Sequence, residues 1–196
     1  MLLEFRTSNY KSFREEMVFS LVPAPKQKGL DYSVLEETAG KRIYHGLCSA
    51  VVYGPNASGK TNIIGAMDAF KAIVLRGHLR NDEGKVSANA ASNLLELIPN
   101  QSLETPEPVC FSIKFISDGI LMEYGFSADL GKFLDSNCRR RVMSEFLKVN
   151  NSQVFSRREG LEFGSFDAIG DFLVNEFAPN EEGAVALAKS NLNEEE

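Results

Sequence analysis

A run of glycine, lysine and threonine in the first third of the chain has the spacing of a phosphate-binding loop. The run reads Gly54-Pro55-Asn56-Ala57-Ser58-Gly59-Lys60-Thr61, which matches the pattern G-x-x-x-x-G-K-T. Gly54 and Gly59 let the backbone turn without a side chain in the way, so that successive N–H groups point inward at phosphate oxygens. Lys60 is expected to reach the β- and γ-phosphates, and the Thr61 hydroxyl to bind a bridging Mg²⁺. The spacing therefore predicts a nucleotide site.

The segments on either side of this loop must hold it in place. Residues 47–53 are a short apolar run with the composition of a strand buried on both faces. Residues 61–75 predict a helix of about four turns. Its expected apolar stripe consists of Ile63, Ile64, Met67, Phe70 and Val74. The loop is thus expected between a buried strand and the positive end of a helix dipole.

The remainder of the chain predicts mostly antiparallel strands. Residues 2–7 and 17–22 alternate like a hairpin, with Leu3, Phe5 and Thr7 on one face. Residues 109–116 and 120–128 alternate around the turn Ser117-Asp118-Gly119. With 140–148, 153–157 and 161–163 they predict a meander of about five strands over 109–163.

The other connections are expected to be less regular. Residues 23–46 predict a long surface connection with at most short elements, because prolines, glycines and charges are scattered through them. Residues 76–108 predict an irregular insertion, with one or two helical turns around 94–98. Ser165 can cap a helix through about residue 177, and the polar tail that ends the sequence is expected to fray.

The acidic strand that normally accompanies such a loop is not evident. Hydrolysis needs a strand of four apolar residues that ends in Asp, which holds magnesium and polarises water. The nearest approach, 172–176, has Asn175 at that position and falls within a helical pattern. Residues 115–118 end in a hairpin turn, and no Leu-Ser-Gly-Gly motif occurs. Glu176 and Asp118 remain the alternatives for a catalytic acid.

Composition excludes several classes of protein. The 196 residues are 43% hydrophobic and 24% charged, with a net charge of −6, which argues against coating nucleic acid by bulk charge. Three cysteines and two histidines, at wide spacing, offer neither a disulfide framework nor a zinc site. No apolar run reaches the roughly 18 residues that span a bilayer, so no membrane association is expected, and the expected compartment is the cytoplasm.

Two motifs together carry a family resemblance. Residues 9–13, Asn-Tyr-Lys-Ser-Phe, and the loop followed by Asn62 resemble the head domains of ABC-type ATPases of the structural-maintenance-of-chromosomes (SMC) and RecF kind. The chain looks most like bacterial "AAA family ATP-binding proteins" of that branch. They are relatives of the overcoming-lysogenisation-defect nucleases and of phage-defence ATPases of the Septu and retron type.

This resemblance implies a fold and a ligand. The fold class is α/β, a P-loop NTPase whose ABC-ATPase-like first lobe has the antiparallel meander packed beside the P-loop strand and helix. The head lobe would span residues 1–180, and 181–196 would lead toward a helical arm and a second lobe. ATP with Mg²⁺ is the implied ligand, and Lys60 is the implied catalytic residue. Lys11 and Ser12 lie where relatives bring the first hairpin near the nucleotide, although a solvated turn explains this pair equally well.

The resemblance also implies partners. ATP on one head would be closed over by a second ATPase head, in a homodimer or higher oligomer. The remaining lobe, a nuclease effector and DNA are the other candidate partners. Ser190 or Asn191 could sense Mg²⁺ and the γ-phosphate, the alternative being a frayed terminal helix. The arginines 139–141 and 157–158 could contact DNA phosphates, the alternative being solvated strand edges.

Three functional classes stay open on the sequence. The first is an ATP-driven dimerising module in a DNA-linked process, phage defence or DNA repair, in which hydrolysis needs the second lobe. The second is a nucleotide-binding assembly module without turnover. The third is a small P-loop kinase or GTPase, for which neither an acidic strand nor an Asn-Lys-x-Asp motif is found.

Overall fold

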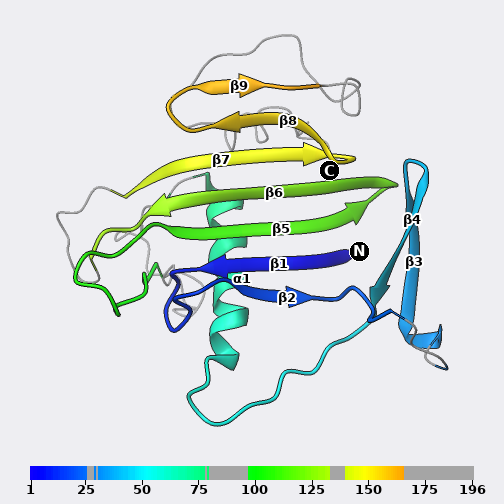
Figure 1. The fold of residues 1–196 in the computed structure, drawn as a ribbon, viewed down its shortest axis with the longest axis horizontal. Helices are drawn as coiled ribbons and strands as arrows, with labels where there is room; N and C mark the ends of the chain where they lie inside the picture. The colour runs from blue at the N-terminus through cyan, green and yellow to red at the C-terminus, as the bar shows by residue number, and fades with distance from the viewer. Residues whose placement is uncertain (26–28, 30, 78, 80–96, 133–139, 166–196) are drawn as a thin grey trace, which may run out of the picture.

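The computed structural model describes residues 1–25, 29, 31–77, 79, 97–132 and 140–165. Within these residues the chain forms one large antiparallel sheet, a separate two-stranded hairpin and one long helix (Figure 1). The helix expected to follow Ser165 lies outside the described residues, as do Asn175, Glu176, Ser190 and Asn191.

The large sheet has the strand order β2-β1-β5-β6-β7-β8-β9, and each neighbouring pair is antiparallel. The N-terminal hairpin supplies two strands, and the predicted meander supplies the other five. The strands are β1 (Leu2–Ser8), β2 (Met17–Ser20), β5 (Val109–Ser117), β6 (Ile120–Asp129), β7 (Arg141–Val149), β8 (Ser152–Arg157) and β9 (Leu161–Phe163). Both the hairpin and the meander predictions are confirmed.

Two tight turns set the register of the meander. Asp118 and Gly119 have φ of 52° and 74°, and Asn150 and Asn151 have φ of 50° and 69°. Positive φ at both central residues is the requirement of the hairpin turn whose twist matches the flanking strands, and Asp, Asn and Gly accept it most readily. The Asp-Gly and Asn-Asn pairs therefore made these hairpins readable from the sequence.

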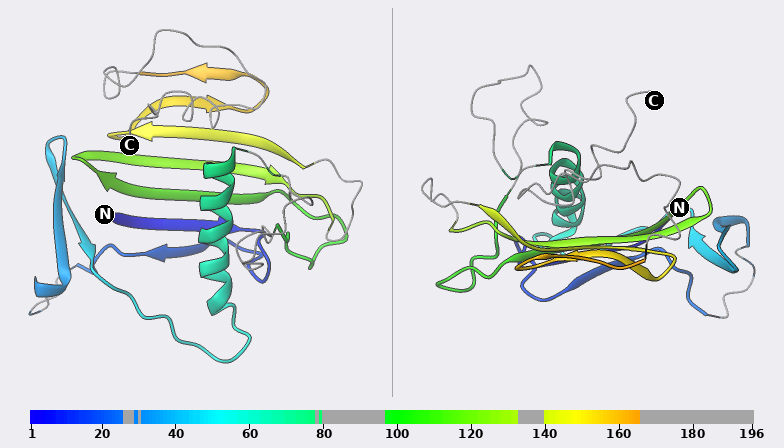
Figure 2. Two further views of the ribbon diagram at one scale, coloured as in Figure 1. Left: turned by 180° about the vertical axis from the view of Figure 1, so that it is seen from behind. Right: turned by 90° about the horizontal axis from the view of Figure 1, so that it is seen from above.

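The helix α1 (Lys60–Arg76) crosses one face of the sheet at a steep angle to its strands (Figure 2). Its length confirms the predicted helix, but the predicted stripe is partly wrong, because Ile64 is 63% exposed. The buried positions are Ala66, Ala69, Phe70 and Ile73.

An aromatic core lies between this helix and the sheet. The Phe70 ring centroid lies 5.8 Å from that of Phe5 and 5.6 Å from that of Phe126. Ala66 and Ala69 join the same buried cluster, and their small side chains let the helix approach the strands closely. The core therefore fixes α1, and with it the loop at the start of α1, on the sheet.

The buried strand expected over 47–53 is absent from the structure. Leu47 is the last residue of the strand β4 (Arg42–Leu47). This strand pairs with β3 (Val34–Ala39), and β3 itself follows a short 3₁₀ turn, η1 (Asp31–Ser33). Val51 and Tyr53 are 72% and 85% exposed. A strand buried on both faces needs neighbours at its edges and layers above and below, and no described strand lies beside this run. The apolar composition was therefore right, and the inferred burial was wrong.

The hairpin of β3 and β4 also corrects the expectation for residues 23–46. Two strands of six residues each stand where only short elements were predicted. Their turn holds Gly40 at φ 60°. Ala39 at the end of β3 is buried beside Leu3, Ile116 and Leu121, so the hairpin packs at the end of the sheet where the chain begins (Figure 1).

Candidate functional site

The phosphate-loop residues lie in an exposed loop that leads directly into α1. Positions 54–58 are exposed, and Gly59 and Lys60 are half-buried. Ala57 and Gly59 have φ of 64° and 89°, in the left-handed region that favours glycine. The backbone N–H of Asn62 donates to the Gly59 carbonyl at 2.9 Å. The loop thus ends in a sharp turn from which the helix starts.

The start of α1 has the properties of an anion site. Its N-cap is Gly59, which supplies no side-chain hydrogen bond, and its first turn holds no acidic residue. The first N–H groups of a helix have no partner within the helix, and they carry the positive end of its dipole. A phosphate placed here would meet donors of the right charge without competition from a capping side chain.

Lys60 lies folded back along the loop. Its Nζ donates to the carbonyl oxygens of Gly54 at 2.8 Å and Pro55 at 2.6 Å. The ammonium therefore lies between the two ends of the loop rather than pointing away from it. A negatively charged phosphate oxygen is a stronger acceptor than a carbonyl, so an anion bound in the loop would compete for this lysine.

The first hairpin turn lies against the same loop. The Asn62 side-chain amide donates to the Ser12 Oγ at 2.8 Å. A Cβ built at Gly59 would lie 2.6 Å from the Ser12 Oγ and 3.4 Å from the Phe13 ring. Lys11 precedes Ser12 in the turn, and its Nζ lies 5.7 Å from the centroid of the Tyr10 ring. The structure therefore places Ser12 at the loop, with Lys11 beside it on the turn.

Tyr10 is a site residue that the sequence did not single out. Its side chain is fully buried, and its hydroxyl donates to the carbonyl of Gly65 on α1 at 3.1 Å. Its ring meets that of Phe111 at 5.5 Å between centroids. Tyr10 thus anchors the turn to the helix and to the sheet. This role depends on contacts with α1 and the sheet, so no local pattern in the sequence indicated it.

The Mg²⁺ prediction rests on Thr61 alone among the described residues. Thr61 is exposed in the first turn of α1, next to Lys60. No three His, Cys, Asp or Glu residues come together as a metal site in the described part of the chain. Mg²⁺ prefers oxygen ligands and keeps several from phosphates and water, so the residues fit an ion brought in with a nucleotide.

The structure argues against Asp118 as an acid for this loop. The turn at 117–119 lies beside the beginning of β1, where Leu2 pairs with Phe115, whereas the turn at 9–13 follows the end of β1. The seven residues of β1 separate them, which is about 20 Å at about 3.3 Å per residue. Glu176, the other alternative, lies outside the described residues.

A buried charge network involves one of the candidate DNA-contacting arginines. Arg157 donates to the Glu145 carboxylate at 3.1 Å, and the Tyr124 hydroxyl donates to the other oxygen at 2.6 Å. The Glu145 side chain is fully buried and that of Arg157 is 18% exposed. Burial, and next the Glu145 charge, raise the pKa of Tyr124 far above its usual range. Arg157 therefore stabilises the sheet, and Arg139 lies outside the described residues.

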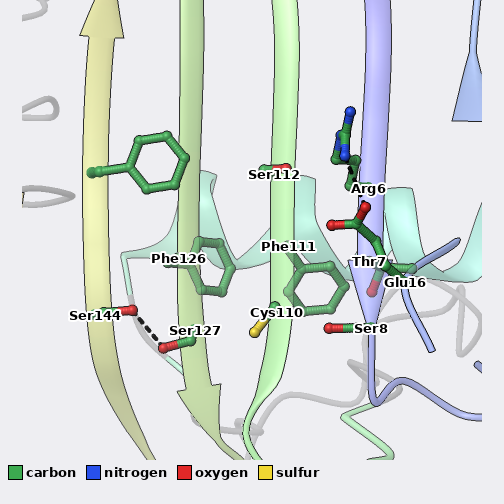
Figure 3. Close-up of a pocket in the computed structure, with 11 residues that line it drawn as sticks. Arg6, Thr7, Ser8, Glu16, Cys110, Phe111, Ser112, Phe126, Ser127 and Ser144 are labelled. Carbon is green, nitrogen blue, oxygen red and sulfur yellow. Dashed lines mark hydrogen bonds and ion pairs between the residues drawn. The ribbon is translucent and has the colours of Figure 1, made fainter. Parts of the chain in front are cut away.

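A shallow hollow of about 170 Å³ on the other face of the sheet is a separate feature (Figure 3). Small side chains line it, among them Cys110, Ser112 and Ser127. Arg6 at its rim is paired with Glu4 at 2.6 Å and with Glu16 at 2.8 Å, and the hollow lies across the sheet from α1. Phe111, Phe126 and Phe146 also line it, so the hollow has an apolar as well as a polar lining and lies apart from the loop.

The loop, the helix that starts from it and the antiparallel sheet behind it define a nucleotide-binding P-loop domain. A family model described as "AAA domain, putative AbiEii toxin, Type IV TA system" matches residues 49–182. The chain belongs to this family, and membership implies nucleotide binding. Searches of curated proteins and of solved structures find no significant match. None of the described helices is long and apolar enough to cross a membrane.

Proposed function

We propose that the chain binds ATP with Mg²⁺ at residues 54–62, with Lys11 and Ser12 completing the site. The observation that carries this proposal is the uncapped start of α1 with the Lys60 ammonium lying across its loop. The backbone donors at the start of a helix and a positive charge at the same place suit a polyphosphate better than a neutral ligand.

Binding would proceed by an exchange of partners at Lys60. Phosphate oxygens replace the two loop carbonyls as its acceptors, and the N–H groups at the start of α1 bind the same phosphates. The Thr61 hydroxyl supplies a ligand to Mg²⁺, and the ion neutralises charge between the β- and γ-phosphates. Ser12, held by Asn62 at the edge of the loop, closes one side of the site.

We further propose that the domain is the ATP-binding lobe of an ABC/SMC-like ATPase. The motif at 9–13, now found against the P-loop, supports this more specific reading, as does the antiparallel sheet under α1. This lobe would join a second lobe and pair with a second head when ATP is bound. The pairing would drive a DNA-linked process in the cytoplasm, either phage defence or DNA repair, and a nuclease would be the effector. The family description adds a toxin–antitoxin system as a setting. The limits 1–180 and 181–196 stay a prediction.

A nucleotide-binding assembly module without turnover is the second candidate. The separation of Asp118 from the loop favours this second candidate. Of the two acids that the sequence suggested, Asp118 is distant from the loop and Glu176 lies outside the described residues. A small kinase or GTPase has no observation in its favour. Measurement of turnover separates the first two candidates, and competition between nucleotides addresses the third.

The test of ATP binding is a calorimetric titration with ATP and Mg²⁺. Lys60→Ala should weaken binding by about 10- to 100-fold, because a charge-assisted hydrogen bond to phosphate is worth about 1.5–3 kcal/mol. Lys71→Ala is the matched control, since Lys71 is an exposed lysine further along α1, and it should bind like the wild type. Both variants should keep the wild-type circular dichroism.

Two outcomes would contradict the proposal. Equal affinity of the wild type and Lys60→Ala would remove the loop as the binding site. A clear preference for GTP over ATP, in competition for a fluorescent nucleotide, would contradict the adenine specificity that the resemblance implies and would favour the GTPase class.

A further inference from the structure

The turn at residues 9–13 is held on two sides, and only one of them is the P-loop. On the other side lies the segment 97–102. The Asn100 side-chain amide donates to the Lys11 carbonyl at 2.7 Å, and its backbone N–H donates to the Asn9 carbonyl at 2.7 Å. In return, the Lys11 N–H donates to the carbonyl of Ile98 at 3.0 Å. Asn100 thus binds two of the residues that precede Ser12 on the turn, Asn9 and Lys11.

The turn needs such support because of its backbone conformation. Asn9 and Lys11 have φ of 56° and 49°. Asn accepts this left-handed backbone readily, but it costs a residue such as lysine roughly 1–2 kcal/mol. Hydrogen bonds from outside the turn can hold it in this shape. The hydrogen bonds from segment 97–102 hold the turn in this way, and a β-bridge joins Tyr10 of the turn to Pro99 of that segment.

Asn100 is itself oriented and anchored. Its Oδ1 accepts from the Ser102 N–H at 3.0 Å and from the Ser102 hydroxyl, which directs its amide nitrogen at the Lys11 carbonyl. The segment before it is fixed in the core, because Leu97 is 4% exposed and Pro99 is fully buried. The support for the turn therefore rests on a rigid base.

We propose that Asn100 is a positioning residue for the nucleotide site. It holds the 9–13 turn so that Ser12 meets Asn62 and the start of α1, and Lys11 lies at the same edge. Asn100 acts through the turn and needs no contact with the nucleotide. The inference rests on the proposed function, since it assigns Asn100 to the site that binds ATP.

The experiment measures Mg-ATP affinity by calorimetry and the free energy of unfolding by urea, in parallel. Asn100→Ala should weaken ATP binding by about fivefold, the effect of about one hydrogen bond that holds a binding residue in place. Gln101→Ala is the matched control. The Gln101 amide donates within its own segment, to the Pro99 carbonyl at 2.9 Å, so its loss should leave the affinity unchanged.

A second background separates positioning from a general loss of stability. In Lys11→Ala/Ser12→Ala, the side chains that the turn presents are gone, so adding Asn100→Ala should change the affinity by less than twofold. A merely structural role would give the same fivefold loss in both backgrounds.

The outcomes distinguish the inference from the proposed function. If the wild type binds ATP, Lys60→Ala binds it about 10- to 100-fold more weakly, and Asn100→Ala binds like the wild type, the positioning role is overturned and the proposed function stands. An equal loss in both backgrounds also overturns the positioning role. If the wild type fails to bind ATP, the proposed function and this inference fall together.

Discussion

Gly59 is the residue on which the loop, the helix and the hairpin turn converge. Its φ of 89° strains any residue that carries a side chain, and a Cβ would stand 2.6 Å from the Ser12 Oγ, so the Ser12 side chain would have to shift. The glycine of the motif therefore has a second role here, because it leaves room for the hairpin turn as well as for phosphate.

Gly59→Ala is expected to lower the free energy of unfolding by about 1–2 kcal/mol, from the left-handed backbone alone, and to weaken ATP binding. Urea unfolding and calorimetry measure the two effects. Gly160→Ala is the control, because Gly160 has no positive φ and nothing within 4 Å of the added Cβ, and it should change stability by less than about 0.5 kcal/mol. Comparable losses in both variants would contradict this role for Gly59.

At the scale of elements, the buried Glu145 connects three strands of the meander. Its carboxylate on β7 is bound by Tyr124 from β6 and Arg157 from β8. Removal of one partner from a buried ion pair leaves a charge without compensation. The network thus holds β6, β7 and β8 in one register.

Arg157→Met should therefore destabilise the protein by about 3–5 kcal/mol, measured by urea unfolding. The double variant Glu145→Leu/Arg157→Met should lose less than Arg157→Met alone, because no charge then stays buried. If the double variant proved the less stable of the two, the hydrogen bonds would matter more than the uncompensated charge.

The sequence predicted these elements unevenly. The meander was readable because period-two alternation and Asp-Gly or Asn-Asn turns are local signals. The P-loop was also readable, because its glycines, lysine and threonine form a local motif of fixed spacing. The burial of residues 51–53 was predicted wrongly, because composition shows that a run is apolar and does not show whether neighbouring strands and layers cover it. The roles of Tyr10 and Asn100 depend on contacts between segments distant in the chain, which no local pattern reveals.

At the scale of the whole molecule, the chain is expected to bind ATP and to turn it over at a rate near background. In the proposed ATPase lobe, hydrolysis would require an acid and donors from a second head in addition to Lys60 and Mg²⁺, and each missing electrostatic element costs about two to three orders of magnitude. Phosphate release by the purified chain is the measurement, and adding a second lobe should raise it. Turnover of about 1 per second by the chain alone would mean that an acid is already in place.

The exposed run before the P-loop has a consequence for handling the protein. Val51, Val52 and Tyr53 present apolar side chains on an extended stretch that pairs with no described strand. Unpaired extended backbone flanked by apolar side chains is a template for intermolecular β-pairing. The isolated chain should therefore aggregate as its concentration rises, and this aggregation should not require nucleotide. A lysine at position 51 or 53 would be the first remedy for its solubility.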